Sequence, residues 1–269
     1  MRLTRTAAIV AAILLSLALP AAAAAKALLI DGSTSMFPLV SQLAAAYHKA
    51  THAPEPKVGQ GTSDVGVNDV DSGRVDIGDV SRNPLPADPK GLYFNKIAKD
   101  GVCVITNDSN PVKNFSPEEV KSIFTGDVRD WSEVPGSTLS GPIDLVDRVA
   151  SSGTQNAFQN IFLGEGTKIS PSAEAQQSNG LVQTKVRTDQ DAIGFVSFAF
   201  TAGTNAVGYN GVACNLANAK SGQYQGVRNF WMVTKGRPKG EAAKFIAWIT
   251  NPKNSIAHKI IGTEWVPIN

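Results

Sequence analysis

The stretch Arg148-Val149-Ala150-Ser151-Ser152-Gly153-Thr154-Gln155 is the most informative part of this chain. It follows an apolar run at residues 143–146 that is typical of a strand, and residues 156–162 after it carry aromatic and aliphatic side chains at helical spacing. The pattern predicts a strand that ends in a Ser-Ser-Gly-Thr turn at the start of a helix. The unpaired N–H groups and the positive dipole end of such a start favour a small oxyanion.

The side chains of this turn suit the same kind of ligand. Ser152 and Thr154 provide hydroxyl groups, Gly153 lets the backbone come close, and Arg148 provides a rigid fork of donors that matches phosphate-like oxygens. Taken alone, the stretch is equally explained by an ordinary helix cap beside a solvated arginine. Further turns of the same kind elsewhere in the chain favour the anion site.

Two earlier segments repeat the order of strand, Gly-Ser-Thr turn and helix. An apolar strand at residues 26–30 runs into Gly32-Ser33-Thr34-Ser35, and a strand that begins at Val58 opens into residues 59–66, which contain Ser63. Because the carboxyl ends of parallel strands meet at one edge of a sheet, such turns come together in space. The turns in both halves of the chain indicate two lobes that converge on one small anion.

Strands and helices alternate along the whole chain, which predicts an α/β fold with mainly parallel sheets. One helix start is well marked. Ser116 is placed to be the N-cap, Pro117 sits at the first helical position, and Glu119 falls at the capping-box position. Gly126 is expected to end that helix.

Residues 1–25 have the features of a signal peptide. Arg2 and Arg5 form a positive n-region, residues 7–19 are apolar but short for a membrane span, and the alanines up to Ala25 offer cleavage sites. We therefore expect an exported protein that begins near residue 25. Without the two arginines the formal net charge of +2 falls to zero, which argues against a nucleic-acid binder or a membrane-surface protein.

The two cysteines, Cys103 and Cys214, lie far apart in the sequence. In an oxidising compartment they could form one disulfide that closes a long loop, and two buried free thiols are the competing interpretation. Neither these cysteines nor the three histidines show the spacing of a metal site, so no metal is expected.

Taken together in this order, the motifs resemble the periplasmic phosphate-binding proteins of ABC importers. Besides the turns described above, the resemblance rests on three segments: Val120-Lys121-Ser122-Ile123-Phe124-Thr125-Gly126 before Trp131, Ser178-Asn179-Gly180, and Ala192-Ile193-Gly194-Phe195. It covers nearly all of the chain after residue 25.

The resemblance implies a type II periplasmic-binding-protein fold with two lobes, each a mainly parallel sheet flanked by helices, and a ligand cleft between them. The expected division is residues 26–104 for the first part of lobe I, 105–205 for lobe II and 206–269 for the return to lobe I. Hinges are expected near residues 102–107 and 206–209.

The resemblance also implies the function. It predicts high-affinity binding of inorganic phosphate in the periplasm and delivery to the transmembrane permease, by a monomer that needs no cofactor and catalyses no reaction. The expected phosphate ligands in this chain are the following residues, of which Ser81 and Arg82 stand where the chain departs from the family pattern: Thr34, Ser35, Ser63, Ser81, Arg82, Arg148, Ser152, Gly153 and Thr154.

The chain departs from the family pattern at two places. Many members carry an aspartate where this chain has Ser81; that carboxylate accepts the proton of hydrogen phosphate and so rejects sulfate. Asp64 or Asp79 could accept the proton instead, although strand alternation could turn Asp79 away. Arg82 either closes over the site or is a solvated loop arginine.

The second departure concerns Arg148. Members of the family often place an acidic residue two positions after this arginine to restrain it, and this chain has Ala150 there. Asp147 is a poor substitute, because neighbours in a strand point to opposite faces. Arg148 is therefore expected to be less restrained, or to be held by another carboxylate.

Three alternatives to phosphate binding remain from the sequence. A receptor for another oxyanion such as sulfate is one, and a signalling or adhesion protein that reuses the fold is the second. The third is an enzyme with Ser152 as nucleophile and His48 or His258 as partner, but the flanking residues are not G-x-S-x-G and both histidines are expected on helix surfaces.

Overall fold

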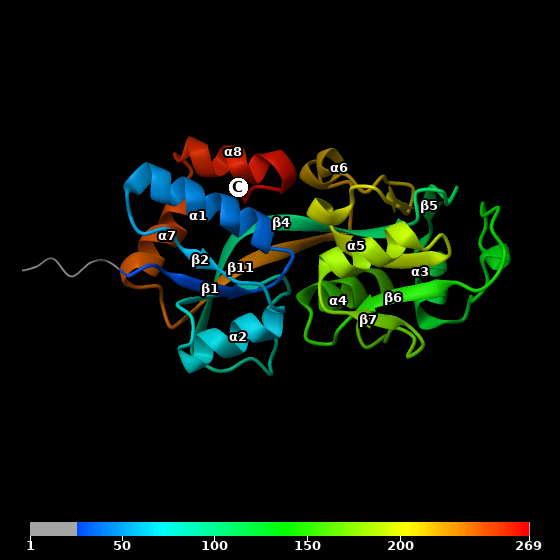
Figure 1. Cartoon of the computed structure of the whole chain (residues 1–269), viewed down its shortest axis with the longest axis horizontal. Coiled ribbons are helices and arrows are strands. Elements are labelled where there is room, and N and C mark those ends of the chain that lie inside the picture. Colours follow the sequence, from blue (N-terminus) through cyan, green and yellow to red (C-terminus); the bar gives the residue numbers. More distant parts are fainter. Residues whose placement is uncertain (1–25, 269) are drawn as a thin grey trace, which may run out of the picture.

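The computed structural model describes residues 26–268 of the chain. It shows an α/β protein of two lobes that lie side by side (Figure 1). Strand β4 (Leu92–Thr106) runs through both lobes, and strand β11 (Val227–Lys235) starts at their boundary. The two-lobed α/β fold expected from the sequence is confirmed, whereas the expected signal peptide at residues 1–25 lies outside the described residues.

The main sheet is mixed, with the strand order β2-β1-β3-β11-β4-β8-β6-β7 and with β9 (Asn205–Ala206) paired to β4. In the first lobe β1 (Leu29–Gly32) is parallel to β2 (Lys57–Val58) and β3 (Ile77–Val80). In the second lobe β6 (Asp144–Arg148) is parallel to β7 (Glu174–Gln176) and β8 (Ala192–Ser197). The antiparallel pairs involve β4 and β11, so each lobe keeps a parallel group of strands whose carboxyl ends can carry a site.

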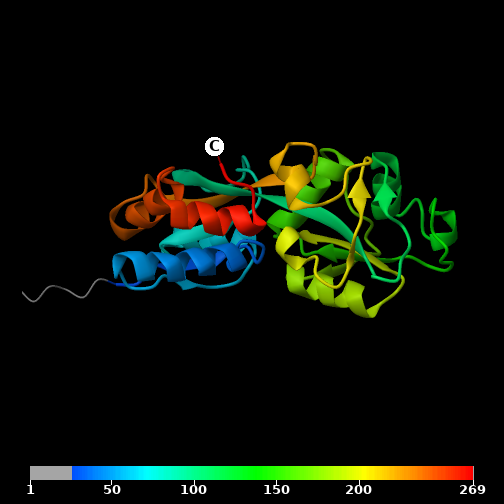
Figure 2. The ribbon, with the colours of Figure 1, turned by 90° about the horizontal axis from the view of Figure 1, so that it is seen from above.

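Eight α-helices flank the sheet in the described chain: α1 (Phe37–Thr51), α2 (Ser63–Ser72), α3 (Pro117–Thr125), α4 (Gly153–Phe158), α5 (Asn179–Thr188), α6 (Leu216–Lys220), α7 (Gly240–Thr250) and α8 (Ser255–Glu264). Short helical turns occur at Trp131–Glu133, Gln159–Leu163 and Phe198–Phe200, and β5 (Asn114–Phe115) pairs with β10 (Gly208–Tyr209) in a small separate sheet. Figure 2 shows α1 and α8 lying side by side on one face of the first lobe.

Each lobe has its own hydrophobic core. In the first lobe, apolar residues of α1, α7 and α8 pack on one face of the sheet around Phe245 and Trp265, and α2 packs on the other face through Val67 and Val70. In the second lobe, α3 to α6 enclose a core that contains Phe158 stacked on Phe195. The two cores are separate clusters, and apolar contacts such as that of Ala199 with the first core link them at the boundary between the lobes.

The crossings between the lobes differ from the sequence-based boundaries. The first core includes Ala98 and the second begins at Val102, so β4 crosses a few residues before the expected boundary at 104. The return crossing lies between residues 227 and 230 on β11, not near 206–209. Residues 207–224 stay in the second lobe because β10 pairs with β5 there and Tyr224 is buried in the second core.

The helix start predicted at residues 116–119 is confirmed. The Ser116 hydroxyl accepts a hydrogen bond from the Glu119 N–H at 3.1 Å, and the Glu119 carboxylate accepts one from the Ser116 N–H at 2.7 Å. Gly126 ends the helix in the left-handed conformation with φ of 82°.

A disulfide joins Cys103 on β4 to Cys214 just before α6, with their Cα atoms 5.8 Å apart. Of the two interpretations that the sequence left open, the structure therefore contains the disulfide and not two free thiols. Both cysteines belong to the second core, so the bond ties the segment after β10 to the central strand of that lobe.

Candidate functional site

A cluster of serine and threonine side chains lies between the lobes, at the carboxyl ends of the parallel strands. In the first lobe they follow β1 and β3 and begin α2, and in the second lobe they follow β6 and begin α4. The residues of this hydroxyl cluster, all buried, are Ser33, Thr34, Ser35, Ser63, Ser81, Ser152 and Thr154. The structure thus brings together every serine and threonine that the sequence predicted for the site, and it adds Ser33.

Ser81 is the centre of the cluster. Its Oγ atom accepts hydrogen bonds from the hydroxyls of Ser33 at 2.7 Å and Ser35 at 3.3 Å, and it lies 3.4 Å from the Ser63 hydroxyl. The Ser81 N–H also donates to Ser63 Oγ at 3.0 Å. Three segments of the first lobe therefore point their hydroxyls at one place.

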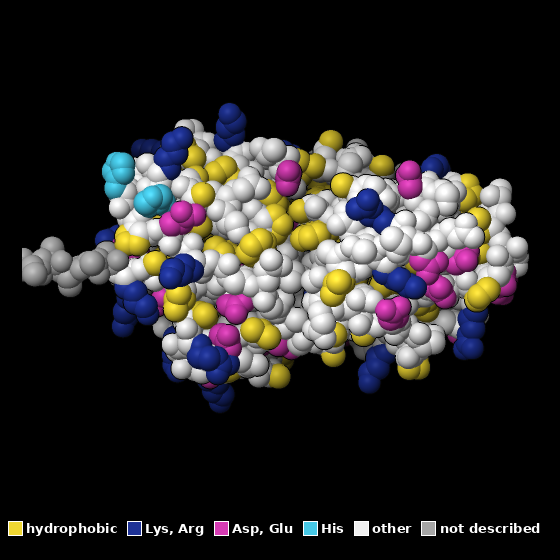
Figure 3. All heavy atoms as spheres, in the orientation of Figure 1, with side chains coloured by type: hydrophobic (Ala, Val, Ile, Leu, Met, Phe, Trp, Pro, Cys, Tyr) yellow, Lys and Arg dark blue, Asp and Glu magenta, His cyan; other side chains and the backbone are white. Residues whose placement is uncertain are grey.

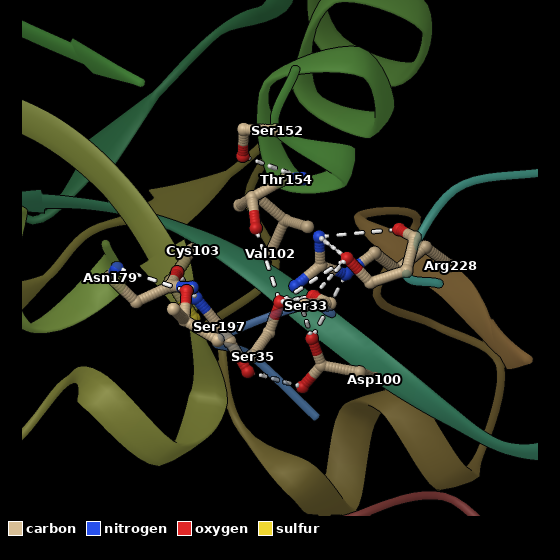
Figure 4. Close-up of polar contacts among 12 residues, drawn as sticks. Ser33, Ser35, Asp100, Val102, Cys103, Ser152, Thr154, Asn179, Ser197 and Arg228 are labelled. Atoms are coloured by element: carbon tan, nitrogen blue, oxygen red, sulfur yellow. Dashed lines mark hydrogen bonds and ion pairs between the residues drawn. The ribbon is translucent and has the colours of Figure 1, made fainter. Parts of the chain in front are cut away.

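The second lobe meets this place through the start of α4. Figure 4 shows Thr154 on that helix pointing toward Ser35, and the two hydroxyls are 3.2 Å apart. A Cβ atom added to Gly153 would lie 2.1 Å from Ser63 Oγ and 2.7 Å from Ser81 Oγ, so a glycine is needed for this approach of the two lobes. Ser152 caps α4 by accepting from the N–H groups of Thr154 and Gln155.

A second contact between the lobes involves Thr34. Its hydroxyl accepts a hydrogen bond from the side-chain amide of Asn179, at the start of α5, at 3.1 Å. Asn179 in turn accepts from the N–H of Ser197 at 3.1 Å, which fixes the orientation of its amide. Asn179 was quoted in the family motif but was not predicted as a site residue.

Arg148 ends β6 with its side chain almost fully buried. Its Nε and Nη2 donate to the backbone carbonyls of Gln176 and Gln177 at 3.1 and 3.0 Å, while Nη1 has no partner. Burial, with the positive charge of Arg228 as a second cause, lowers the pKa of Arg148 to about 10, so the side chain is charged at neutral pH.

The restraint on Arg148 differs from both sequence-based expectations. Carbonyl oxygens hold the guanidinium, and the nearby Asp147 carboxylate acts on its charge without a hydrogen bond to it. Asp147 instead accepts from the backbone N–H of Arg148 at 2.6 Å and from the side-chain amide of Gln155 at 2.7 Å. Burial raises the pKa of the Asp147 carboxyl, and these hydrogen bonds oppose that rise.

Arg228 is a second buried arginine at the site, and sequence reasoning missed it. Its Nε and Nη2 donate to one Asp100 oxygen at 3.0 and 2.8 Å, and its Nη1 lies 3.4 Å from both oxygens of Ser81. Asp100 also accepts from the Ser197 hydroxyl at 2.9 Å (Figure 4). The sequence signal was an arginine just before the apolar run 230–233, but its partner lies 128 residues away.

Arg82 is buried but is already paired. Its guanidinium binds Asp64 at 2.9 Å and Asp88 at 2.6 Å, and it also donates to the carbonyl of Asn83. Within residues 26–268, no hydrogen bond joins the side chains of Arg82 or Asp64 to the hydroxyl cluster. These ion pairs hold the loop after β3 against α2.

Asp79 on β3 is buried, and its Oδ1 has no hydrogen-bond partner. Burial raises the pKa of this carboxyl well above its ordinary value, and the negative charge of Asp31 adds to the effect. In the described chain no hydrogen bond connects Asp79 to Ser81, two positions further along.

Both histidines that the sequence offers as partners of Ser152 lie on helices of the first lobe. His48 bonds to the carbonyl of Ala53 in the first lobe, and His258 lies on α8. Within the described chain no histidine is hydrogen-bonded to Ser152, and no group of His, Cys, Asp and Glu side chains could hold a metal ion. Over the same residues, none of the helices has the length and apolar character to span a membrane.

The match to a family model settles the family. The model of the PBP superfamily domain matches residues 19–253, most of the chain. The chain belongs to this family. A curated relative, the phosphate-binding protein PstS of Bacillus subtilis, is 29% identical over 252 residues, which cover 91% of this chain and 82% of the relative.

Two solved structures are similar to this member of the family over its length. One, from Clostridium perfringens, is assigned as a phosphate ABC transporter substrate-binding protein and contains bound phosphate; it is 28% identical, with a TM-score of 0.83 over 91% of this chain and 100% of the other. The other, an ABC-type phosphate transport receptor from Vibrio cholerae, is 26% identical, with a TM-score of 0.71 over 90% and 100%.

Proposed function

We propose that this protein is an exported receptor that binds inorganic phosphate between its lobes and delivers it to the transmembrane permease of an ABC importer. It works in the periplasm as a monomer, needs no cofactor and catalyses no reaction. The names of the relative from Bacillus subtilis and of the two similar structures support this function. On the face shown in Figure 3, charged side chains of both signs are scattered over both lobes, so local geometry must attract the anion.

The observation that carries the proposal is the buried charge of Arg148. Its hydrogen-bond partners are neutral carbonyl oxygens, and one of its donors is unused. A buried charge that is hydrogen-bonded only to neutral groups is costly, and an opposite charge bonded directly to it lowers that cost. A phosphate ion provides that charge and accepts from the unused donor.

The proposed ligands are the hydroxyls of the cluster, the backbone N–H group of Gly153, and Arg148. Thr34 and Ser152 each accept bonds from protein N–H groups, which leaves their own hydroxyl protons free for the ligand. Arg82 stands outside the set because Asp64, Asp88 and Asn83 already occupy its donors.

Closure of the lobes follows from the same contacts. The ligand would bond to Ser63 and Ser81 from one lobe and to Thr154 and Arg148 from the other, and a ligand shifts a conformational equilibrium only by its differential affinity for the two states. The bond between Ser35 and Thr154 shows how close the lobes come in this arrangement.

Titration calorimetry on protein stripped of bound anion tests the proposal. Wild-type protein is expected to bind one phosphate, and Arg148→Met is expected to lose about 3 kcal/mol, a hundredfold or more in Kd. The control Arg237→Met removes an exposed arginine and should bind as wild type. Since replacing a buried charge by an apolar group is often neutral or stabilising, the anion-free Arg148→Met protein should keep its Tm. Equal binding by Arg148→Met and wild type would refute the proposed site.

A further inference from the structure

Ser81 differs from a carboxylate in one property that matters for ligand choice. An ionised carboxylate only accepts hydrogen bonds, whereas a serine hydroxyl both accepts and donates. Ser81 Oγ stands where the hydroxyls of Ser33, Ser35 and Ser63 converge, so a bound anion would place an oxygen beside it. That oxygen can be protonated, and donate to Ser81, or bare, and accept from it.

The carboxylates around the cluster are engaged with other partners or have no hydrogen bond to the cluster. Asp64 pairs with Arg82, Asp100 pairs with Arg228 and Ser197, and Asp147 holds an amide and a backbone N–H. Asp79 is buried, its Oδ1 has no hydrogen-bond partner, and burial raises the pKa of its carboxyl. Throughout residues 26–268, no carboxylate oxygen is hydrogen-bonded to a hydroxyl of the cluster. The site thus has no carboxylate that would require the ligand to carry a proton.

Arg228 places a hydrogen-bond donor at the site, where many family members have a carboxylate acceptor. Asp100 fixes its Nε and Nη2, and Phe230 packs against its guanidinium at 5.4 Å, so the side chain is held in one position. The remaining group, Nη1, faces Ser81 Oγ at 3.4 Å, a distance at which a ligand oxygen could replace the weak contact. Arg228 also lies close enough to Arg148 to lower its pKa.

From this geometry we infer that Arg228 is a second anion-binding arginine and that, with Ser81, it makes the site accept tetrahedral dianions whether or not they carry a proton. This inference rests on the proposed function and adds its selectivity: hydrogen phosphate and sulfate both bind, and dihydrogen phosphate binds more weakly. The charge of Arg148, to which no carboxylate is hydrogen-bonded, favours the double charge, and Arg228 adds a donor beside its ion pair with Asp100. The hydroxyl of Ser81 fits either a protonated or a bare oxygen.

The test is calorimetric titration of the stripped protein with inorganic phosphate and with sulfate at pH 6 and pH 8. Sulfate is a dianion at both values, so it reports any change in the protein itself. We expect Kd values for the two anions within about tenfold of each other at pH 8. Phosphate loses its second proton near neutral pH. We therefore expect the ratio of the phosphate Kd to the sulfate Kd to be several-fold higher at pH 6 than at pH 8.

Two variants separate the roles of the residues. Arg228→Lys keeps a cation for Asp100 but removes the fork, and it should weaken both anions about tenfold or more. Ser81→Asp introduces an acceptor-only group, and it should weaken sulfate at least tenfold more than phosphate. Ser255→Asp, on the exposed start of α8, adds the same charge away from the site and should change neither.

The outcomes distinguish this inference from the function on which it rests. Tight phosphate binding with sulfate more than a hundredfold weaker in the wild type would overturn the inference and leave the phosphate receptor intact. Unchanged affinities in a folded Arg228→Lys protein would overturn the role of Arg228. If Arg228→Lys does not fold, the sulfate and phosphate affinities of Ser81→Asp still test the selectivity. Failure of both anions to bind the wild type would overturn the proposed function and the inference together.

Discussion

Replacing Gly153 by alanine places a methyl group in the contact between the lobes. The added Cβ would lie 2.1 Å from Ser63 Oγ and 2.7 Å from Ser81 Oγ, both in the other lobe. Such overlaps are relieved only by shifts that cost about 1–3 kcal/mol. Because the overlap is between lobes, the cost applies to the closed arrangement and not to the folding of either lobe.

The predicted consequence is a loss of phosphate affinity without a loss of stability. A cost of about 1–3 kcal/mol corresponds to a Kd roughly 5- to 150-fold weaker. Titration calorimetry would measure the affinity, and scanning calorimetry without anion should show a Tm unchanged or slightly higher, since alanine favours a helix over glycine by up to about 1 kcal/mol.

Gly262→Ala is the matched control for this prediction. Gly262 lies on α8, and apart from the adjoining backbone of that helix no atom lies within 4 Å of the position where its Cβ would be, so the variant should bind phosphate as wild type does. Wild-type affinity in Gly153→Ala would refute the claim that the lobes close as described. A large drop in the anion-free Tm would show instead that Gly153 matters for folding.

Three further predictions concern stability. Reduction of the Cys103–Cys214 disulfide, which spans 111 residues, should lower the free energy of unfolding by roughly 2–5 kcal/mol in urea titrations; an unchanged midpoint would contradict it. Ser116→Ala should cost about 1 kcal/mol in the same assay, and Ser140→Ala, on the exposed surface, should cost nothing. Asp79→Asn should make the free energy of unfolding fall less as the pH rises.

The sign of the Asp79 effect follows from proton binding. The pKa of the Asp79 carboxyl is raised in the folded state, so the folded protein binds more protons than the unfolded chain above about pH 4. The contribution of Asp79 to the free energy of unfolding is complete below about pH 4 and declines as the pH rises toward the folded-state pKa. Urea titrations at pH 5 and pH 8 should show a smaller decline for Asp79→Asn; an equal decline would contradict the assignment.

Local features of the fold could be predicted from the sequence. The capping box of Ser116 and Glu119 uses residues within one helical turn, and the Ser-Gly-Thr turns lie directly after their strands. Such signals need no knowledge of distant contacts. These local patterns predict that the hydroxyl groups of both lobes meet at one site, because the carboxyl ends of parallel strands converge.

Features that depend on distant partners could not be predicted. Arg228 is held by Asp100 from a neighbouring strand, and Arg148 is held by backbone carbonyls at the end of β7, which no side-chain pattern reveals. The sequence predicts a strand at Val207–Tyr209 but not its pairing partner, so the expected return of the chain to the first lobe near residue 206 comes too early. In the structure that segment pairs with β5 of the second lobe.

The most direct test of the central claim is a crystal structure of the mature protein grown with phosphate. The account predicts one phosphate between the lobes, within hydrogen-bond distance of Ser63, Ser81, Thr154 and Arg148 Nη1. Phosphate bound elsewhere, or closed lobes in which Arg148 makes no contact with it, would contradict the account.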